Sequence, residues 1–129
     1  MMSARAALCY EKYLANASFA TALAVQFPDR ADWSCVLQFY AALHLMNAYL
    51  IDKSIVNLDP LNVIHDDRRQ AMKQCPELRD APKRFRELKD LSERVRYDAS
   101  FIFSETHRQL TVDLLARLAA IVEPKLRRS

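Results

Sequence analysis

Histidine and arginine side chains at helical spacing are the residues of this sequence that could do chemistry. Tyr40 lies four residues before His44, and His65 lies four residues before Arg69. Residues four apart lie on one face of a helix. An imidazole can transfer a proton near neutral pH, and a guanidinium can bind a phosphate through its forked donors. These pairs therefore point to acid–base chemistry or to anion binding.

His44 lies in the most apolar segment of the chain. At about 100° per residue it shares a narrow arc of a helix with four large side chains, namely Trp33, Leu37, Tyr40 and Ile51. We expect this arc to face the core, with His44 pointing inward beside Tyr40. An inward histidine is either a hydrogen-bonded core residue or an acid–base group, and the sequence leaves both roles open.

His65 and Arg69 open a short predicted helix. The free amides of a first helical turn can hold an anion, and these two side chains would add to that site. In the alternative, His65 helps to cap the helix and Arg69 pairs with an acidic neighbour. The sequence favours neither role over the other.

Arg96 lies at the edge of an amphipathic face, and Tyr97 follows it. The face carries Phe85, Leu88, Leu91, Ser92 and Val95. A guanidinium at a core edge needs a carboxylate, a carbonyl, a tyrosine or a phosphate, because an unpaired buried charge is costly. Arg96 is thus a structural clamp or a ligand-binding residue. The mixed charges of residues 83–94 predict a solvated surface, and the apolar stripe around His107 predicts a packing role.

Five helices would position these residues. Apolar periodicity and breaker residues predict helices over 3–27, 31–52, 65–74, 82–97 and from 104 to about 118 or beyond, with a long loop over 53–64. Asp29 or Asp32 and Ser104 are suitable N-caps, and Pro82 suits a first helical turn. We expect an all-α helical bundle of about five helices, in one domain over residues 1–129. The segment 31–52 is apolar almost all round, which predicts a central helix.

Composition excludes several classes of function. The chain has 129 residues, 51% of them hydrophobic, enough for one compact core. It contains no glycine, so the Gly-rich phosphate loops of Walker and Rossmann sites are excluded. Its three cysteines include no C-x-x-C pair, and no His and carboxylate set has metal spacing. We expect buried free thiols, no metal and no cofactor.

Charge and hydropathy bear on partners and location. The net charge of +3 is too small to indicate nucleic-acid binding by itself. No run of 18 uninterrupted apolar residues occurs, and the first residues do not form a leader with a cleavage site. We expect a cytoplasmic protein that does not contact a membrane.

Three segments together carry a resemblance to a known family. The segment Tyr40-Ala-Ala-Leu-His44-Leu, the pair His65-x-x-x-Arg69 and the segment Leu88-Lys-Asp-Leu-Ser92-Glu-Arg-Val-Arg96-Tyr97 resemble, in order and spacing, a bacterial branch of the HEPN superfamily. The resemblance spans residues 40–97. It implies a bundle built on a four-helix core and a homodimer.

Many HEPN proteins are metal-independent ribonucleases of toxin–antitoxin or antiviral defence systems. Their sites use an arginine that precedes a histidine, with four to six residues between the two. None of His44, His65 and His107 has an arginine at those positions. The usual nuclease motif is therefore absent, which leaves open whether the chain is an enzyme.

Three hypotheses follow. The first is a HEPN-like binding or regulatory module for RNA, a nucleotide or a partner protein, whose ligand-binding residues are Tyr40, His44, His65, Arg69, Arg96 and Tyr97. The second is a metal-independent ribonuclease with a rearranged site, for which His65, Arg96 and His44 are the catalytic candidates. The third is a dimerisation scaffold, in which the same residues only hold the helices together.

Overall fold

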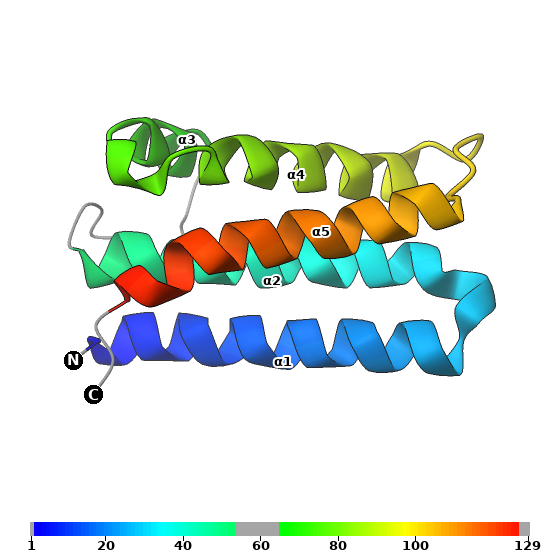
Figure 1. Ribbon diagram of the computed structural model, residues 1–129, viewed down its shortest axis with the longest axis horizontal. Helices are drawn as coiled ribbons and strands as arrows, with labels where there is room; N and C mark the ends of the chain where they lie inside the picture. The colour runs from blue at the N-terminus through cyan, green and yellow to red at the C-terminus, as the bar shows by residue number, and fades with distance from the viewer. Residues whose placement is uncertain (1, 54–64, 127–129) are drawn as a thin grey trace.

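The computed structural model describes residues 2–53 and 65–126, apart from the side chains of residues 65–67. Within these ranges every long element is a helix: α1 (Ala4–Gln26), α2 (Ala31–Asp52), α3 (His65–Lys73), α4 (Ala81–Tyr97) and α5 (Glu105–Val122) (Figure 1). Short 3-10 turns occupy Pro28–Arg30, Pro76–Leu78 and Glu123–Lys125. The all-α bundle of five helices is confirmed. The predicted loop falls outside the described residues from position 54 onward.

Side chains cap the starts of two helices, of which the cap at Ser104 was predicted. Ser3 Oγ accepts a hydrogen bond from the Ala6 amide (3.2 Å) at the start of α1. Ser104 caps α5 in a capping box with His107, as its sequence position predicts. The predicted aspartate cap of α2 is wrong. Arg30 occupies the cap position without a side-chain bond, because the 3-10 turn that starts at Pro28 leads directly into α2.

The central position of α2 is confirmed. It packs against α1, α4 and α5 (Figure 1). Its Leu45, Met46 and Leu50 are fully buried, as are Leu88 of α4 and Leu118 of α5. The segment Pro28–Asp52 is long and apolar enough to cross a membrane, yet most of it is buried inside the bundle. Its apolar character is accounted for by packing against the other helices.

Small side chains hold α1 against α2. Ser34 Oγ donates a hydrogen bond to the Ala20 carbonyl (3.0 Å), so this face of α2 contacts α1. Ala41 and Ala48 follow Ser34 at intervals of seven residues, on the same face, and are fully buried. Ala6 of α1 is fully buried too. Alanines allow the two helix backbones to approach closely. The opposite face of α1 is not covered by this contact.

The second half of α1 exposes an apolar surface. Its exposed large side chains are Leu14, Phe19 and Val25, whereas Leu8 in the first half is followed one helical turn later by the exposed Glu11 and Lys12. No charged residue occurs between Tyr13 and Pro28. Monomeric proteins rarely expose large contiguous apolar patches, and a two-fold interface places the same patch on both subunits. An uncharged patch suits such self-association because it brings no like charges together. The predicted homodimer would bury this face.

Phe19→Glu should therefore weaken self-association, because Phe19 is 59% exposed on that face and a carboxylate there would be desolvated in the interface. Light scattering coupled to gel filtration should give a dimer for the wild type and a monomer for the variant. Ile102→Glu is the control, since Ile102 is 82% exposed in the turn between α4 and α5. A monomeric wild type, or a dimeric Phe19→Glu, would show that this prediction is wrong.

Candidate functional site

Arg96 forms a cluster with tyrosines from two helices. Its Nη1 donates to the Tyr40 hydroxyl (3.3 Å) and to the Tyr97 hydroxyl (3.5 Å), and its Nε donates to the Ser92 carbonyl (3.2 Å). The guanidinium lies 5.0 Å from the ring centroid of Tyr97 and 5.8 Å from those of Tyr40 and Phe39. The expected position of Arg96 at a core edge, with a tyrosine and a carbonyl as partners, is confirmed. Three predicted site residues thus lie together.

The outer part of this cluster is open to solvent. Tyr97 is 76% exposed, whereas Tyr40 and Arg96 are half-buried. An arginine over an aromatic ring is favourable by about 0.5–1 kcal/mol at exposed sites. These contacts hold Arg96 beside the Tyr97 ring, most of whose surface remains available to a further flat group.

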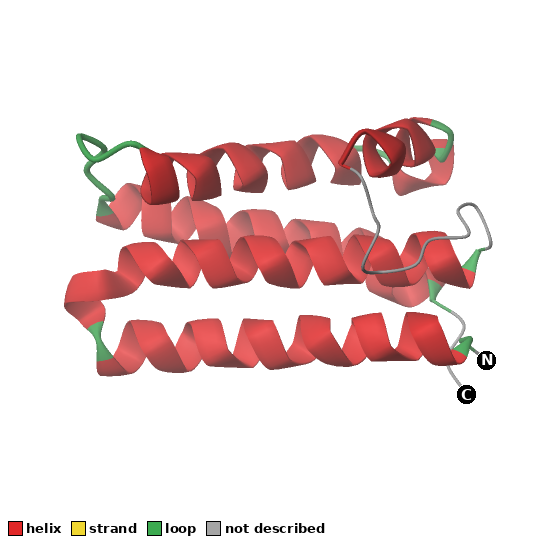
Figure 2. Ribbon diagram, turned by 180° about the vertical axis from the view of Figure 1, so that it is seen from behind, coloured by secondary structure: helices red, strands yellow, loops and turns green. Residues whose placement is uncertain are grey.

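The predicted inward direction of His44 is wrong. Its arc is the least covered side of α2: Trp33 is 43% exposed, and Leu37, Tyr40 and His44 are half-buried. Viewed from behind, α2 runs between α1 and α4, with α5 on its far side (Figure 2). Because α2 is apolar all round, periodicity alone could not identify its packed faces. The small residues Ala41 and Ala48 mark one of them.

The surroundings of His44 favour its neutral form. Partial burial lowers the pKa of the imidazole, and the positive charges of Lys12 and Arg68 lower it further. His44 is accordingly neutral at pH 7. Among the described residues no hydrogen bond or ion pair joins it to Arg96 or Tyr40, so these candidates do not form one catalytic set.

Arg69 lines a different site, a cavity of about 260 Å³ between α3 and α4. Five basic residues and one acidic residue surround an apolar floor in this basic pocket. The basic residues are Arg68, Arg69, Lys73, Arg86 and Lys89, the acidic one is Asp90, and the floor is Met72, Pro82 and Phe85. The arrangement combines a strongly positive rim with a surface on which an apolar group could rest.

Arg68 is the structural member of the basic pocket. It is only 3% exposed, and its Nε donates to Oδ1 of Asn47 on α2 (2.8 Å). Burial lowers the pKa of its guanidinium to about 10, so it remains protonated at pH 7. The bond to Asn47 joins α3 to the central helix. It thereby sets the position of the α3 side of the pocket.

The other cations of the pocket are less engaged. Within the described parts of the chain, no hydrogen bond or ion pair holds the side chains of Arg69, Lys73 or Arg86. Lys89 pairs with Glu93 at 3.8 Å. Arg69, Lys73 and Arg86 are exposed, so their charges are available to an external anion.

Of the residues that line this pocket, the sequence predicts only Arg69 as a site residue. The mixed charge around Arg86 and Lys89 predicts a solvated surface, and Lys73 is not among the predicted residues. The four-residue interval from Arg69 to Lys73 was a signal, since it places both on one face of α3. The partnership with α4 comes from tertiary packing, which that signal does not contain.

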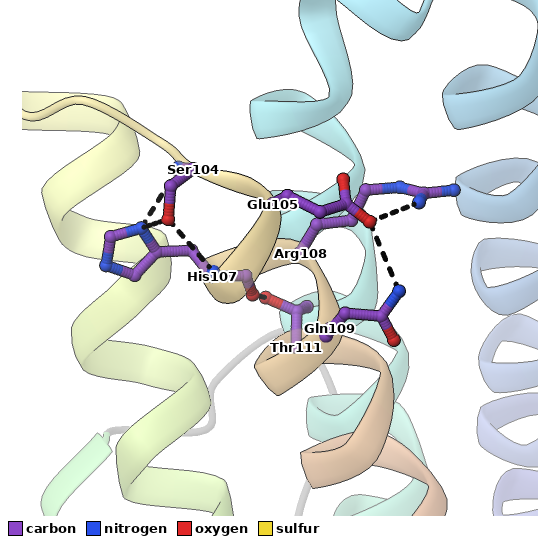
Figure 3. A network of polar contacts seen from close by, with 6 residues as sticks. All are labelled: Ser104, Glu105, His107, Arg108, Gln109 and Thr111. Carbon is purple, nitrogen blue, oxygen red and sulfur yellow. Dashed lines mark hydrogen bonds and ion pairs between the residues drawn. The ribbon is translucent and has the colours of Figure 1, made fainter.

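The two remaining histidines lie at the starts of two other helices, His65 in α3 and His107 in α5. His65 is the first residue of α3, but its side chain lies outside the described residues. His107 does more than pack, because its Nδ1 accepts from the Ser104 amide (3.0 Å) and its ring stacks on Phe103. Figure 3 shows this cap beside the Glu105 carboxylate and its partners. The network belongs to the start of α5 and forms no site.

The described residues contain no group of three or more histidine, cysteine, aspartate or glutamate side chains that could hold a metal ion. Cys9, Cys35 and Cys75 are buried free thiols, as expected. Partial burial raises the pKa of each thiol, so none is a thiolate at pH 7. The anion chemistry of the basic pocket therefore rests on its arginine and lysine side chains.

The lowered pKa of His44 makes stability depend on pH. Unfolded His44 takes up a proton near its ordinary pKa of 6.5, before the folded form does, so stability is present above that pH and is lost as the pH falls through and below it. Urea unfolding of wild type and His44→Gln should show a difference that shrinks between pH 7.5 and 5.5. A difference independent of pH would contradict the lowered pKa.

Comparisons of the chain with protein-family models, with curated proteins and with solved structures found no match. The helical bundle is established by the structure itself. The HEPN resemblance stays a prediction that rests on the three sequence segments.

Proposed function

We propose that this chain is a non-catalytic, HEPN-like binding module for RNA or a nucleotide, and that the basic pocket between α3 and α4 receives a phosphate of the ligand. The observation that carries the proposal is the convergence of five cations from two helices on one cavity. Asp90 is the single acidic residue of its lining. A pocket of that sign selects an anionic group.

The chemistry of the pocket favours a phosphate ester over a simple anion. Arginine forks match phosphate oxygens in a bidentate geometry, and lysine adds a point charge. The floor of Met72, Pro82 and Phe85 offers an apolar surface to a sugar or a base. A cavity of about 260 Å³ is at the small end of ligand sites. One nucleotide unit of a ligand suits it.

Two features support the HEPN-like part of the proposal. The chain is an all-α bundle, as the resemblance implies. The first and third resembling segments, far apart in sequence, meet in the hydrogen bond from Arg96 to Tyr40. A module without the nuclease motif suits a regulatory role, in which it holds RNA or a protein partner of a toxin–antitoxin or defence system in the cytoplasm.

The double substitution Lys73→Ala with Arg86→Ala should weaken binding of a fluorescein-labelled single-stranded RNA, measured by anisotropy. Two lost phosphate contacts should reduce affinity at least tenfold at 50 mM salt and lower the slope of log K against log salt by about two. Both side chains are exposed, so the fold should be preserved.

The matched control is Arg5→Ala with Arg117→Ala, which removes the same net charge from exposed positions on α1 and α5, outside the pocket. It should change affinity by no more than about twofold, because only distant, screened charge is lost. Equal losses in both double variants would mean that binding depends on overall charge alone, and the pocket would not be the site.

A second candidate function is a metal-independent ribonuclease, and His44 is the observation that favours it. A half-buried histidine that is neutral at pH 7 can accept a proton from a 2′-hydroxyl group. The positive charges of Lys12 and Arg68 act on it, and such charges could stabilise a developing phosphorane. Its weakness is that Arg96 belongs to a separate cluster.

Incubation of the protein with total RNA in EDTA distinguishes the two functions. The binding module should leave the RNA intact over hours. Cleavage that survives EDTA and disappears in a folded His44→Ala variant would establish the ribonuclease. A protein that neither cleaves nor binds RNA or nucleotides would leave two hypotheses, a module for a protein partner and the dimerisation scaffold.

A further inference from the structure

One face of α4 connects the basic pocket with the Arg96 cluster. Lys89 lines the pocket, and Arg96 follows it by seven residues, two helical turns, on the same face. The axial distance between the two positions is about 10 Å. Tyr97 lies beyond Arg96 at the end of the helix. The two sites are therefore neighbours on one continuous surface.

The two ends of this surface offer different chemistry. The pocket end holds cations that engage phosphate oxygens. The other end holds an exposed tyrosine ring beside a guanidinium. Unpaired bases stack on exposed aromatic rings and arginine planes, and this stacking does not depend on the base sequence. A base inside a duplex has no free face to offer, so a duplex would use only the phosphate end.

We infer that the ligand is a single strand of nucleic acid that lies along α4, with a phosphate in the basic pocket and a base stacked on Tyr97. This inference rests on the proposed function and goes further by naming the form of the ligand. Stacked nucleotides rise about 3.4 Å each, so the 10 Å interval corresponds to about three steps. A strand of about four nucleotides reaches both ends, and a mononucleotide reaches one.

Glu93 lies between the two ends on the same face of α4 and pairs with Lys89. Its carboxylate would lie close to the phosphates of the bound strand. Lys89 neutralises part of this charge, but Glu93 then competes with the phosphates of the strand for the lysine. Glu93 thus lowers affinity for a strand that spans the surface, and Glu93→Gln should raise it severalfold.

Oligouridines and oligodeoxythymidines of one to eight nucleotides test the inference with the full chain, by anisotropy and competition. Affinity should rise steeply up to about four nucleotides and only slightly thereafter. Tyr97→Ala should weaken binding of the tetranucleotide roughly 5- to 150-fold and leave binding of the mononucleotide unchanged, while Tyr97→Phe should retain most of the affinity. Phe27→Ala is the matched control, because Phe27 is an exposed aromatic residue at the end of α1.

The failures of the two proposals are distinguishable. A mononucleotide that binds as tightly as the tetranucleotide, or a folded Tyr97→Ala variant with unchanged tetranucleotide affinity, would overturn the strand along α4 and leave the phosphate pocket standing. Absence of binding for every oligonucleotide and for the mononucleotide would overturn the proposed function itself. Equal binding of the two series assigns a general single strand, and preference for oligouridine assigns RNA.

Discussion

The arrangement of this bundle depends on the burial of one helix that is apolar on almost every side. Burial of an apolar side chain such as Leu45 or Leu50 is worth about 1.5–3 kcal/mol, and α2 gains it only where α1, α4 and α5 cover it. Three neighbours leave one arc of the central helix open, and Tyr40 and His44 lie there. Both sites flank or touch this arc, because Arg96 reaches Tyr40 from α4 and Arg68 bonds to Asn47 from α3.

Much of this fold could be predicted from the sequence, because its signals are local. Apolar periodicity, Pro28, Pro76 and the Ser104 cap place four of the five helices within one or two residues of their ends, and α5 runs on to Val122. The direction of His44 could not be predicted, since a helix that is apolar almost all round has no polar face to indicate which sides are packed. Contacts with helices far away in sequence determine which faces of α2 are buried.

The two parts of the candidate site differ in the same way in how far the sequence predicts them. Arg96 with Tyr40 and Tyr97 could be anticipated, because a cation at a core edge requires partners and tyrosines occur at matching positions. The basic pocket could not, because Lys73 and Arg86 belong to elements whose packing together no local pattern encodes. Mixed charge on a helix such as α4 is ordinarily a solvated face. It becomes a candidate site here because α3 adds cations, while Asp90 is the one acidic residue of the lining and Glu93 pairs with Lys89 from outside it.

The bond between Arg68 and Asn47 separates two properties of the pocket that usually change together. Arg68 positions α3, whereas Arg69 and Lys73 supply charge from the same helix. Asn47 is itself buried and uncharged. Its replacement by a residue that cannot accept a hydrogen bond would change the spacing of the cations without altering their number. Divergence at this one buried amide would thus change the geometry of the pocket while its net charge stayed the same.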